Sequence, residues 1–414
     1  MLMLSGPTTV VKYRPNSYNS ILSFNNPIGE NNHMLPITII GTGLAGYTVA
    51  REFRKLDKDA PLRLITDDDG HFYSKPMLSN AFAQKKTPES LVTTPVTKMA
   101  EQLNAEILTD TPITKIDPAQ HAVYAGDKRL DYSQLVLAWG AEPIRLPLAG
   151  NAADKVLSVN TLIEYAEFRA ALEEGKRVVI MGAGLIGCEF ANDLQPAGFS
   201  VTLIDLAPQA LGRLVPAEVS QALQEALQEL GITLLFGKAV KSVDQAESGY
   251  RLSLTDDSIV EADVVLSAIG LRPRTELAAQ AGLSVERGIV VDRFLKTTAE
   301  DIYALGDCIQ IEGLVLPFVM PLMNAGRAIA KSLAGQETAV NYPAMPVVVK
   351  TPAFPMVVSP PAVGLKGEWQ IEVEGKDVKA LFYTPSQQLG GFVLTGEKVA
   401  EKAALTKELP PVLV

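Results

Sequence analysis

Two glycine-rich segments carry the most recognisable chemistry in the sequence. Residues 41–46 read Gly-Thr-Gly-Leu-Ala-Gly, and residues 182–187 read Gly-Ala-Gly-Leu-Ile-Gly. In such a turn between a strand and a helix, the first glycine permits a tight turn and the second lets the backbone approach a pyrophosphate. The third glycine lets the helix pack on the strand. The helix N-terminus then offers free N–H groups and a positive dipole end to the phosphates. Each segment therefore predicts a dinucleotide site, the alternative being a glycine turn used only for packing.

A carboxylate follows each loop at the position where a ribose would bind. In the first unit Asp67 is predicted to hold the adenosine ribose hydroxyls, with Asp68 as the alternative. In the second unit Asp205 would accept a hydrogen bond from a free 2′-hydroxyl and repel a 2′-phosphate. The first arginine after it is Arg213, so the local chemistry favours NADH over NADPH. The alternative for Asp205 is a solvated strand end that binds nothing.

Both loops need the same framework: a strand before the loop, then a helix and a second strand. Short β-branched or apolar runs predict the strands, and longer periodic stretches predict the helices. The repetition of this pattern in one chain is an internal repeat. The expected elements are strand 37–40, helix 44–56 and strand 62–65, then strand 178–181, helix 185–194, strand 201–204 and the amphipathic helix 217–230.

The pattern changes beyond about residue 340. Proline-rich segments give way to three alternating runs, 369–373, 378–383 and 391–394, separated by turn residues. We expect an antiparallel meander there, followed by a helix from Glu397 to about Leu405. A unit of this kind often serves as a cap or an interface.

Composition excludes several classes of function. A chain of 414 residues that is 47% hydrophobic is expected to form two or three domains. Its net charge of −10 argues against a general nucleic-acid surface. Cys188 and Cys308 have no CxxC spacing, so neither a disulfide framework nor a dithiol redox centre is expected. The three histidines lie far apart and indicate no metal site, and no apolar run reaches the length of a membrane span.

The first 33 residues differ from the rest. They are rich in Asn, Ser, Pro and Gly and lack the features of a secretory signal. We expect a disordered tail or a non-native extension, with Met34 a natural beginning for the folded part. Cytoplasmic residence is then the default expectation.

A third segment suggests which dinucleotides bind. The run from Ile302 to Asp307, Ile-Tyr-Ala-Leu-Gly-Asp, resembles the second FAD signature of the two-dinucleotide flavoprotein reductases, whose aspartate binds the ribitol chain. Residues 135–143 and 267–277 resemble that family's two crossovers between its FAD and NAD domains. The resemblance implies FAD on the first loop and NADH on the second. Trp139 would pack at the cofactor, or alternatively be an ordinary core tryptophan.

The segment Tyr73–Ser79, Tyr-Ser-Lys-Pro-Met-Leu-Ser, narrows the resemblance. It is similar to the motif of the branch that serves small iron–sulfur or iron–thiolate carriers and lacks a redox disulfide. Residues 36–410 are similar to the bacterial rubredoxin–NAD reductases. Asp205 stands where some relatives lack an acid, so the choice of NADH rests on local chemistry.

This resemblance implies an α/β fold with two Rossmann-like, glutathione-reductase-like dinucleotide-binding domains and a small α+β C-terminal domain. The implied ranges are a tail at 1–33, a discontinuous FAD-binding domain at 34–145 and 272–340, an NAD-binding domain at 146–271, and a C-terminal meander and helix at 341–414.

The implied reaction is hydride transfer from NADH to FAD, followed by release of single electrons to rubredoxin. Lys75 resembles the family's basic residue beside the flavin, and Glu189 projects from the first turn of the second nucleotide helix. We predict that these two catalytic residues form an ion pair at the flavin–nicotinamide junction. Lys350, a lone lysine in an apolar segment, is a weaker candidate for the flavin edge, against a snorkelling lysine on a strand.

The full set of expected contacts follows from the loops and the resembling segments. For FAD they are Gly41, Thr42, Gly43, Leu44, Ala45, Gly46, Asp67, Lys75, Pro76, Trp139, Gly140, Gly306, Asp307 and Lys350. For NADH they are Gly182, Gly184, Leu185, Ile186, Gly187, Asp205 and Gly270. No metal ligands are expected.

Other functions fit the same residues. The chain could reduce a [2Fe–2S] ferredoxin or a flavorubredoxin, or it could be an NADH-sensing flavoprotein with slow turnover. A rubredoxin is usually acidic, so a basic patch near the flavin edge is expected despite the net charge. Relatives support alkane degradation or defence against oxygen, and both pathways stay open.

Overall fold

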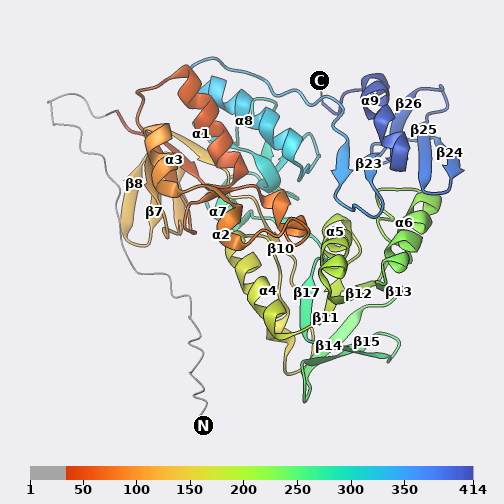
Figure 1. The fold of residues 1–414 in the computed structure, drawn as a ribbon. Helices are drawn as coiled ribbons and strands as arrows, with labels where there is room; N and C mark the ends of the chain where they lie inside the picture. Colours follow the sequence, from red (N-terminus) through yellow and green to blue (C-terminus); the bar gives the residue numbers. More distant parts are fainter. Residues whose placement is uncertain (1–33, 414) are drawn as a thin grey trace, which may run out of the picture.

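The computed structural model describes residues 34–413, so the prediction for residues 1–33 lies outside the described part. The first nucleotide unit is built on a parallel sheet in the order β20-β9-β1-β2-β5. Helices α1 and α8 run side by side across it (Figure 1). A Cβ on Gly326 would come within 2.7 Å of the Thr48 side chain, so glycine is what lets these two helices approach closely. The bounds are β1 (Ile37–Ile40), α1 (Leu44–Leu56), β2 (Leu62–Ile65), β5 (Glu106–Leu108), β9 (Gln134–Leu137), β20 (Ile302–Ala304) and α8 (Val319–Leu333).

The second nucleotide unit repeats this architecture. Its parallel sheet has the order β13-β12-β11-β17, and an antiparallel meander, β14-β15-β16, adjoins it. Helix α4 starts with a capping box, in which the Thr161 hydroxyl and the Glu164 carboxylate each satisfy a backbone N–H of the first turn. The bounds are α4 (Leu162–Glu174), β11 (Arg177–Met181), α5 (Leu185–Leu194), β12 (Ser200–Asp205), α6 (Ala217–Glu229), β13 (Thr233–Phe236), β14 (Val240–Gln245), β15 (Tyr250–Leu254), β16 (Ile259–Ala262) and β17 (Val264–Ser267).

Two short antiparallel strands join the units. The chain leaves the first unit through β10 (Ala141–Pro143) and returns through β18 (Leu271–Pro273), and these strands pair with each other. The smaller remaining elements of the first unit lie around its sheet. They are β3 (Phe72–Tyr73), η1 (Lys75–Asn80), α2 (Pro88–Leu91), β4 (Val92–Thr94), α3 (Val96–Leu103), β6 (Lys115–Asp117), η2 (Pro118–Gln120), β7 (Ala122–Ala125), β8 (Lys128–Asp131), α7 (Glu276–Gln280), β19 (Ile289–Val291), η5 (Gly306–Cys308) and β21 (Ile309–Ile311). Two short 3-10 turns, η3 (Ala153–Lys155) and η4 (Gln195–Ala197), belong to the second unit.

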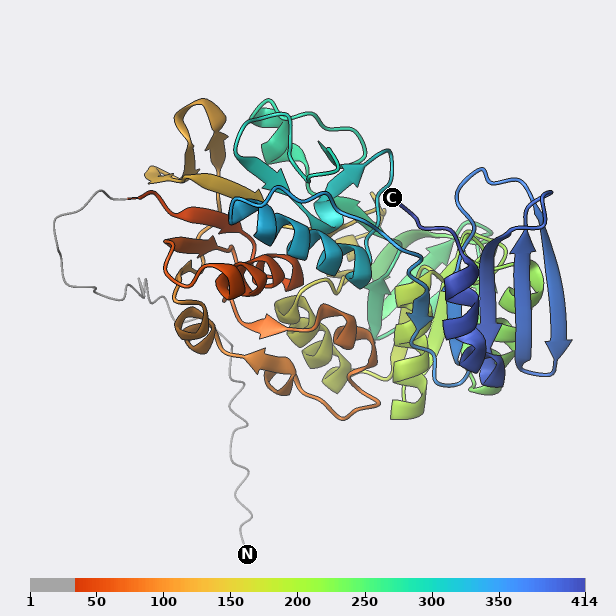
Figure 2. The same ribbon diagram turned by 90° about the horizontal axis from the view of Figure 1, so that it is seen from above.

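The C-terminal unit is a five-stranded antiparallel sheet in the order β22-β23-β26-β25-β24. It lies beside helices α5 and α6, as both views show (Figures 1 and 2). Its side chains alternate between two faces, so Val393 packs against the second nucleotide unit while Phe392 and Leu394 pack near α9. The bounds are β22 (Val347–Val349), β23 (Met356–Ser359), β24 (Glu368–Glu374), β25 (Asp377–Tyr383), β26 (Leu389–Thr395), η6 (Gly396–Glu401) and α9 (Lys402–Glu408).

The structure confirms the predicted α/β class with two dinucleotide-binding units and an α+β C-terminal unit. The three-stranded meander is also present, although two further strands from the proline-rich segment extend it. The second core reaches beyond its own unit: Leu78, Ala81 and Leu91, from the first unit's sequence, are buried within it. Between residues 34 and 413 no helix is long and apolar enough to cross a membrane.

Candidate functional site: two glycine cradles and a buried ion pair

The first glycine loop is shaped by contacts that exclude side chains. A Cβ on Gly41, whose φ is 110°, would lie 2.4 Å from the Ala138 carbonyl oxygen, and one on Gly46 would lie 1.9 Å from the Gly41 carbonyl oxygen. A Cβ on Gly43 would meet nothing within 4 Å. The middle glycine therefore borders open space at the N-terminus of α1, where a pyrophosphate can approach the backbone.

The second loop has the same geometry. A Cβ on Gly182 would lie 2.6 Å from the Ala268 carbonyl oxygen, and one on Gly187 would lie 1.8 Å from the Gly182 carbonyl oxygen. Gly184, like its counterpart in the first loop, faces open space at the start of α5. Two equivalent cradles for a dinucleotide are thus present, and Leu185 and Ile186 begin the helix behind the second one.

The carboxylates that follow the loops differ in what they bind. Asp205 accepts backbone N–H groups from Ala183 at 2.5 Å and Ala207 at 2.7 Å, which fixes it beside the second glycine loop. Leu206 follows it with 68% of its surface exposed. Within residues 34–413 the side-chain hydrogen bonds that Asp205 accepts come from main-chain N–H groups, and no basic side chain forms an ion pair with it.

In the first unit the neighbouring carboxylates Asp67 and Asp68 have different contacts. Asp68 Oδ1 accepts hydrogen bonds from the Thr42 hydroxyl at 3.2 Å, the Thr66 hydroxyl at 2.6 Å and the Gly70 N–H at 2.9 Å. It ties the loop after β2 to the glycine loop. Asp67 is the more exposed carboxylate, and its one ion pair within residues 34–413 is with Arg274 at 3.6 Å. It is therefore the freer of the two to meet a ribose.

The FAD-like signature lies against the first glycine loop. A Cβ on Gly306 would be 3.4 Å from that of Ala45, so the turn after β20 packs beside the start of α1. Asp307 follows, and burial raises the pKa of its carboxyl group, an effect that Lys75 opposes. Trp139 is half-buried and donates its indole N–H to the Arg274 carbonyl oxygen at 2.8 Å.

Lys75 lies at the start of η1 and turns toward this signature. Its Nζ donates to Asn160 Oδ1 at 3.1 Å. Burial lowers the pKa of Lys75, and the carboxylate of Asp307 is the largest effect that raises it. The predicted ion pair between Lys75 and Glu189 is wrong, because the Lys75 ammonium bonds Asn160 whereas the Glu189 carboxylate pairs with Lys350.

Glu189 instead pairs with Lys350. Its side chain is 4% exposed, and its Oε2 accepts from Lys350 Nζ and, at 2.6 Å, from the Ser79 hydroxyl. Its Oε1 accepts the backbone N–H of Lys350 at 3.0 Å. Lys350 Nζ also donates to the Pro76 carbonyl oxygen and to Ser79 Oγ, both at 2.7 Å. The pair joins all three units, since Ser79, Glu189 and Lys350 come from one unit each.

Helix α5 has two more buried polar side chains one turn further on. Asp193 accepts the backbone N–H groups of Phe82 at 2.9 Å and Ala83 at 2.8 Å, and Asn192 accepts that of Ala353 at 3.1 Å. Sequence reasoning missed both, and it missed Ser79 and Asn160 as well. The signal for α5 was available, because Asn192 and Asp193 are adjacent polar residues in a helix whose remaining residues, apart from Glu189, are apolar or glycine.

Two family models match the chain. The model described as "Pyridine nucleotide-disulphide oxidoreductase" matches residues 35–330, which is more than half of the chain. This chain belongs to that family. A second model, "Rubredoxin binding C-terminal domain", matches residues 339–409. Family membership makes FAD and NADH the cofactors, and the two open glycine cradles fit two dinucleotides.

Named relatives extend over nearly the full chain. The rubredoxin-NAD(+) reductase of Alcanivorax borkumensis is 50% identical over 381 residues, which are 92% of this chain and 100% of the relative. The nitric oxide reductase FlRd-NAD(+) reductase of Aliivibrio fischeri is 38% identical over 91% of this chain and 98% of the relative. The crystal structure of the covalent putidaredoxin reductase–putidaredoxin complex matches with a TM-score of 0.82 at 27% identity, covering 92% of this chain and 94% of that one.

This pyridine nucleotide-disulphide oxidoreductase has no disulphide among its described residues. Cys188 and Cys308 are both buried free thiols, and burial raises the pKa of Cys308 to about 12. Burial also raises the pKa of Cys188, whose Sγ lies 3.5 Å from the Ala183 carbonyl oxygen. Such thiols are poor nucleophiles, so they act in packing. Within residues 34–413 no cluster of His, Cys, Asp and Glu could hold a metal ion.

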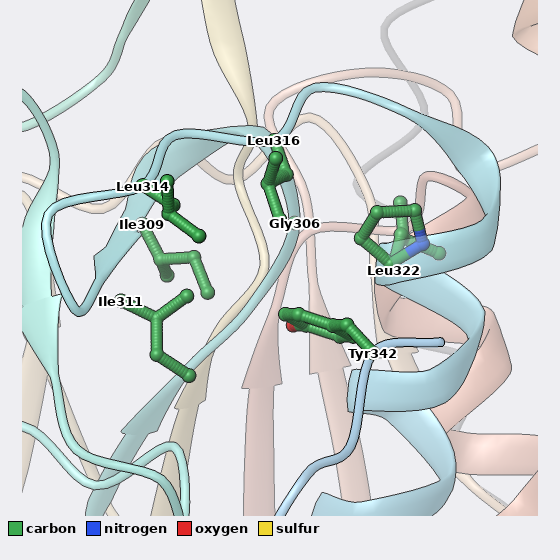
Figure 3. Close-up of a pocket in the computed structure, with 8 residues that line it drawn as sticks. Gly306, Ile309, Ile311, Leu314, Leu316, Leu322 and Tyr342 are labelled. Atoms are coloured by element: carbon green, nitrogen blue, oxygen red, sulfur yellow. The ribbon is translucent and has the colours of Figure 1, made fainter. Parts of the chain in front are cut away.

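A small apolar pocket adjoins the oxidoreductase's FAD-like signature (Figure 3). Its volume of about 10 Å³ is room for roughly one water molecule. In Figure 3 Ile309 and Ile311 lie on one side of it and Leu322 on the other. The lining residues are Gly306, Ile309, Ile311, Leu314, Leu316, Pro321, Leu322 and Tyr342.

Proposed function

We propose that this oxidoreductase takes electrons from NADH onto FAD and passes them singly to rubredoxin. The observation that carries the proposal is the match of residues 339–409 to a rubredoxin-binding domain, on a chain that is 50% identical over 92% of its length to a rubredoxin-NAD(+) reductase. The first cradle is assigned to FAD because the signature ending in Asp307 packs beside it. The second is assigned to NADH because Asp205 is held at its edge.

Bound FAD would supply the chemistry that accepts a hydride and releases single electrons. The protein's part is to orient both cofactors and set the charge around them. Lys75 supplies a positive charge next to Asp307 on the side of the first cradle. Glu189 and Lys350 sit where α5, η1 and the C-terminal unit meet. The Lys350 ammonium compensates the charge of the buried Glu189 carboxylate next to the second cradle, where an unpaired carboxylate would be strongly destabilising.

Stopped-flow kinetics tests the proposal. NADH should reduce the protein-bound flavin, and purified rubredoxin should reoxidise it in one-electron steps faster than a [2Fe–2S] ferredoxin does. Salt over tens to hundreds of millimolar should slow the second step, since an acidic carrier needs a basic docking patch. A strong preference for ferredoxin would refute the assignment of the partner.

A flavorubredoxin is a second candidate acceptor. The observation that favours it is the identity of 38% and 39% to two nitric oxide reductase FlRd-NAD(+) reductases, over 91% and 90% of the chain. The chemistry demanded of this chain would be the same, because the acceptor would again be a one-electron iron centre. Comparing turnover with free rubredoxin and with a flavorubredoxin separates the two.

The proposal also covers the cellular compartment and the pathway that the electrons serve. We place the reaction in the cytoplasm, where NADH is available, and propose that the electrons serve either alkane degradation or defence against oxygen. Alkane degradation predicts that a strain lacking the gene grows poorly on an alkane and normally on an organic acid. Equal growth on both, with greater sensitivity to oxygen, would support defence against oxygen.

A further inference from the structure

Asn160 is a buried amide at the meeting point of the two nucleotide units. It lies just before α4 and is 5% exposed. Its Nδ2 donates to the Ala141 carbonyl oxygen on β10 at 2.9 Å, and its backbone N–H donates to the Glu164 carboxylate at 2.8 Å. Its Oδ1 accepts from Lys75 Nζ at 3.1 Å. Each polar group thus has its own partner, which leaves the amide a single orientation.

The bond to this amide is the one hydrogen bond that Lys75 Nζ makes in the described part of the chain. Four other charged groups face Lys75. Asp307 from η5, Glu164 from α4 and Asp68 from the loop after β2 favour its ammonium form, and Arg274 after β18 opposes it. Burial is the largest effect and lowers the pKa of Lys75. A desolvated ammonium with one acceptor depends strongly on that acceptor.

From this geometry we infer that Asn160 is a positioning residue, which holds the Lys75 ammonium at the junction of the two nucleotide units and thereby next to the bound FAD. The inference rests on the proposed assignment of FAD to the first cradle. Asn160 belongs to the second unit, whereas Lys75 and Asp307 belong to the first. A residue of the second nucleotide unit therefore fixes the position of the charged side chain next to the flavin in the first.

A purely structural role of Asn160 would have different consequences from the positioning of Lys75. Asn160 also tethers the start of α4 to β10, and that tether alone would affect stability without affecting Lys75. Tyr73 offers a matched control, because its hydroxyl accepts the Leu162 N–H at 3.1 Å and so ties the same segment to the same helix. Tyr73→Phe removes this tether and leaves the acceptor of Lys75 in place.

The test uses the FAD-loaded protein, without NADH or a carrier. Spectroelectrochemical titration at a series of pH values locates the pH at which loss of the Lys75 proton changes the flavin midpoint potential. Asn160→Leu should move that pH down by about one unit, the value of one hydrogen bond to a charged group, and Asn160→Asp should move it up. Both variants are compared in the wild-type and Lys75→Met backgrounds, with Tyr73→Phe as the control.

The expected result is a pair of opposite shifts that vanish in the Lys75→Met background, while Tyr73→Phe changes the melting temperature alone. Equal effects in both backgrounds, or the absence of a Lys75-dependent transition in the wild type, would overturn the inference. If Asn160→Leu does not retain FAD, the near-isosteric Asn160→Asp decides by the sign of its shift. Failure to reduce rubredoxin in a separate turnover assay would overturn the proposed partner and leave this result unaffected.

Discussion

Replacing Lys350 with methionine should destabilise the protein far more than removing an exposed ion pair would. The Glu189 carboxylate is 4% exposed and would keep two partners, the Ser79 hydroxyl and the backbone N–H of residue 350. Removing one partner of a buried ion pair costs about 3–5 kcal/mol. The two remaining hydrogen bonds place the expected loss near the lower end, at about 3 kcal/mol.

The matched control is Lys376→Met. Lys376 and Glu229 also join the C-terminal unit to the second nucleotide unit, with their side chains 2.5 Å apart, but these are 58% and 63% exposed. Exposed pairs contribute about 0–1 kcal/mol. The measurement is urea unfolding of the FAD-loaded protein, which compares apparent free energies of unfolding.

A loss no larger than that of Lys376→Met would refute this account of the pair. The double variant Glu189→Leu/Lys350→Met should recover most of the stability, because no buried charge remains.

Three further predictions follow from the cradles and from α5. Asp205→Ala combined with Leu206→Arg should shift the ratio of kcat/KM from NADH toward NADPH by at least tenfold, since a repelling carboxylate gives way to a cation; an unchanged ratio would show that Asp205 does not face the ribose. Gly43→Ala should fold normally but bind FAD more weakly, because its methyl group enters the open space where the pyrophosphate is expected. Gly46→Ala should lower the melting temperature, because its methyl group meets a carbonyl oxygen 1.9 Å away. Calorimetry and FAD titration distinguish the two effects. Burial raises the pKa of Asp193, so the contribution of this carboxyl to stability should fall as pH rises above about 4. The free energy of unfolding of the wild type relative to Asp193→Asn, measured in urea, should therefore decrease over that range.

The sequence predicted the local elements well because their signals are local. Glycine turns between an apolar run and a periodic stretch specify strand, loop and helix without long-range information, and β1, α1, β11 and α5 begin within a residue of the expected positions. The meander at the C-terminus was visible for the same reason. Its two additional strands were hidden by the prolines around them, which usually argue against strands.

The pairing of charged residues could not be predicted in the same way. Glu189 and Lys350 are 161 positions apart and meet only after the C-terminal sheet packs on the second unit. Lys75 has the charge that a partner of Glu189 needs, but its position at the start of η1 places its ammonium against Asn160. The placement of Leu78 in the second core was equally inaccessible, because nothing in an apolar segment says which of two cores will bury it.

Helix α5 recognises its neighbours through their main chains. Glu189, Asn192 and Asp193 accept four backbone N–H groups, those of Phe82, Ala83, Lys350 and Ala353. A main-chain N–H is supplied by every amino acid except proline, so these contacts demand little of the residues that donate them. Apart from Ser79 and Lys350, whose side chains also bond Glu189, the segments that α5 holds are therefore free to diverge in sequence. The exposed surface of the C-terminal unit can therefore change in evolution while its contacts with α5 stay the same.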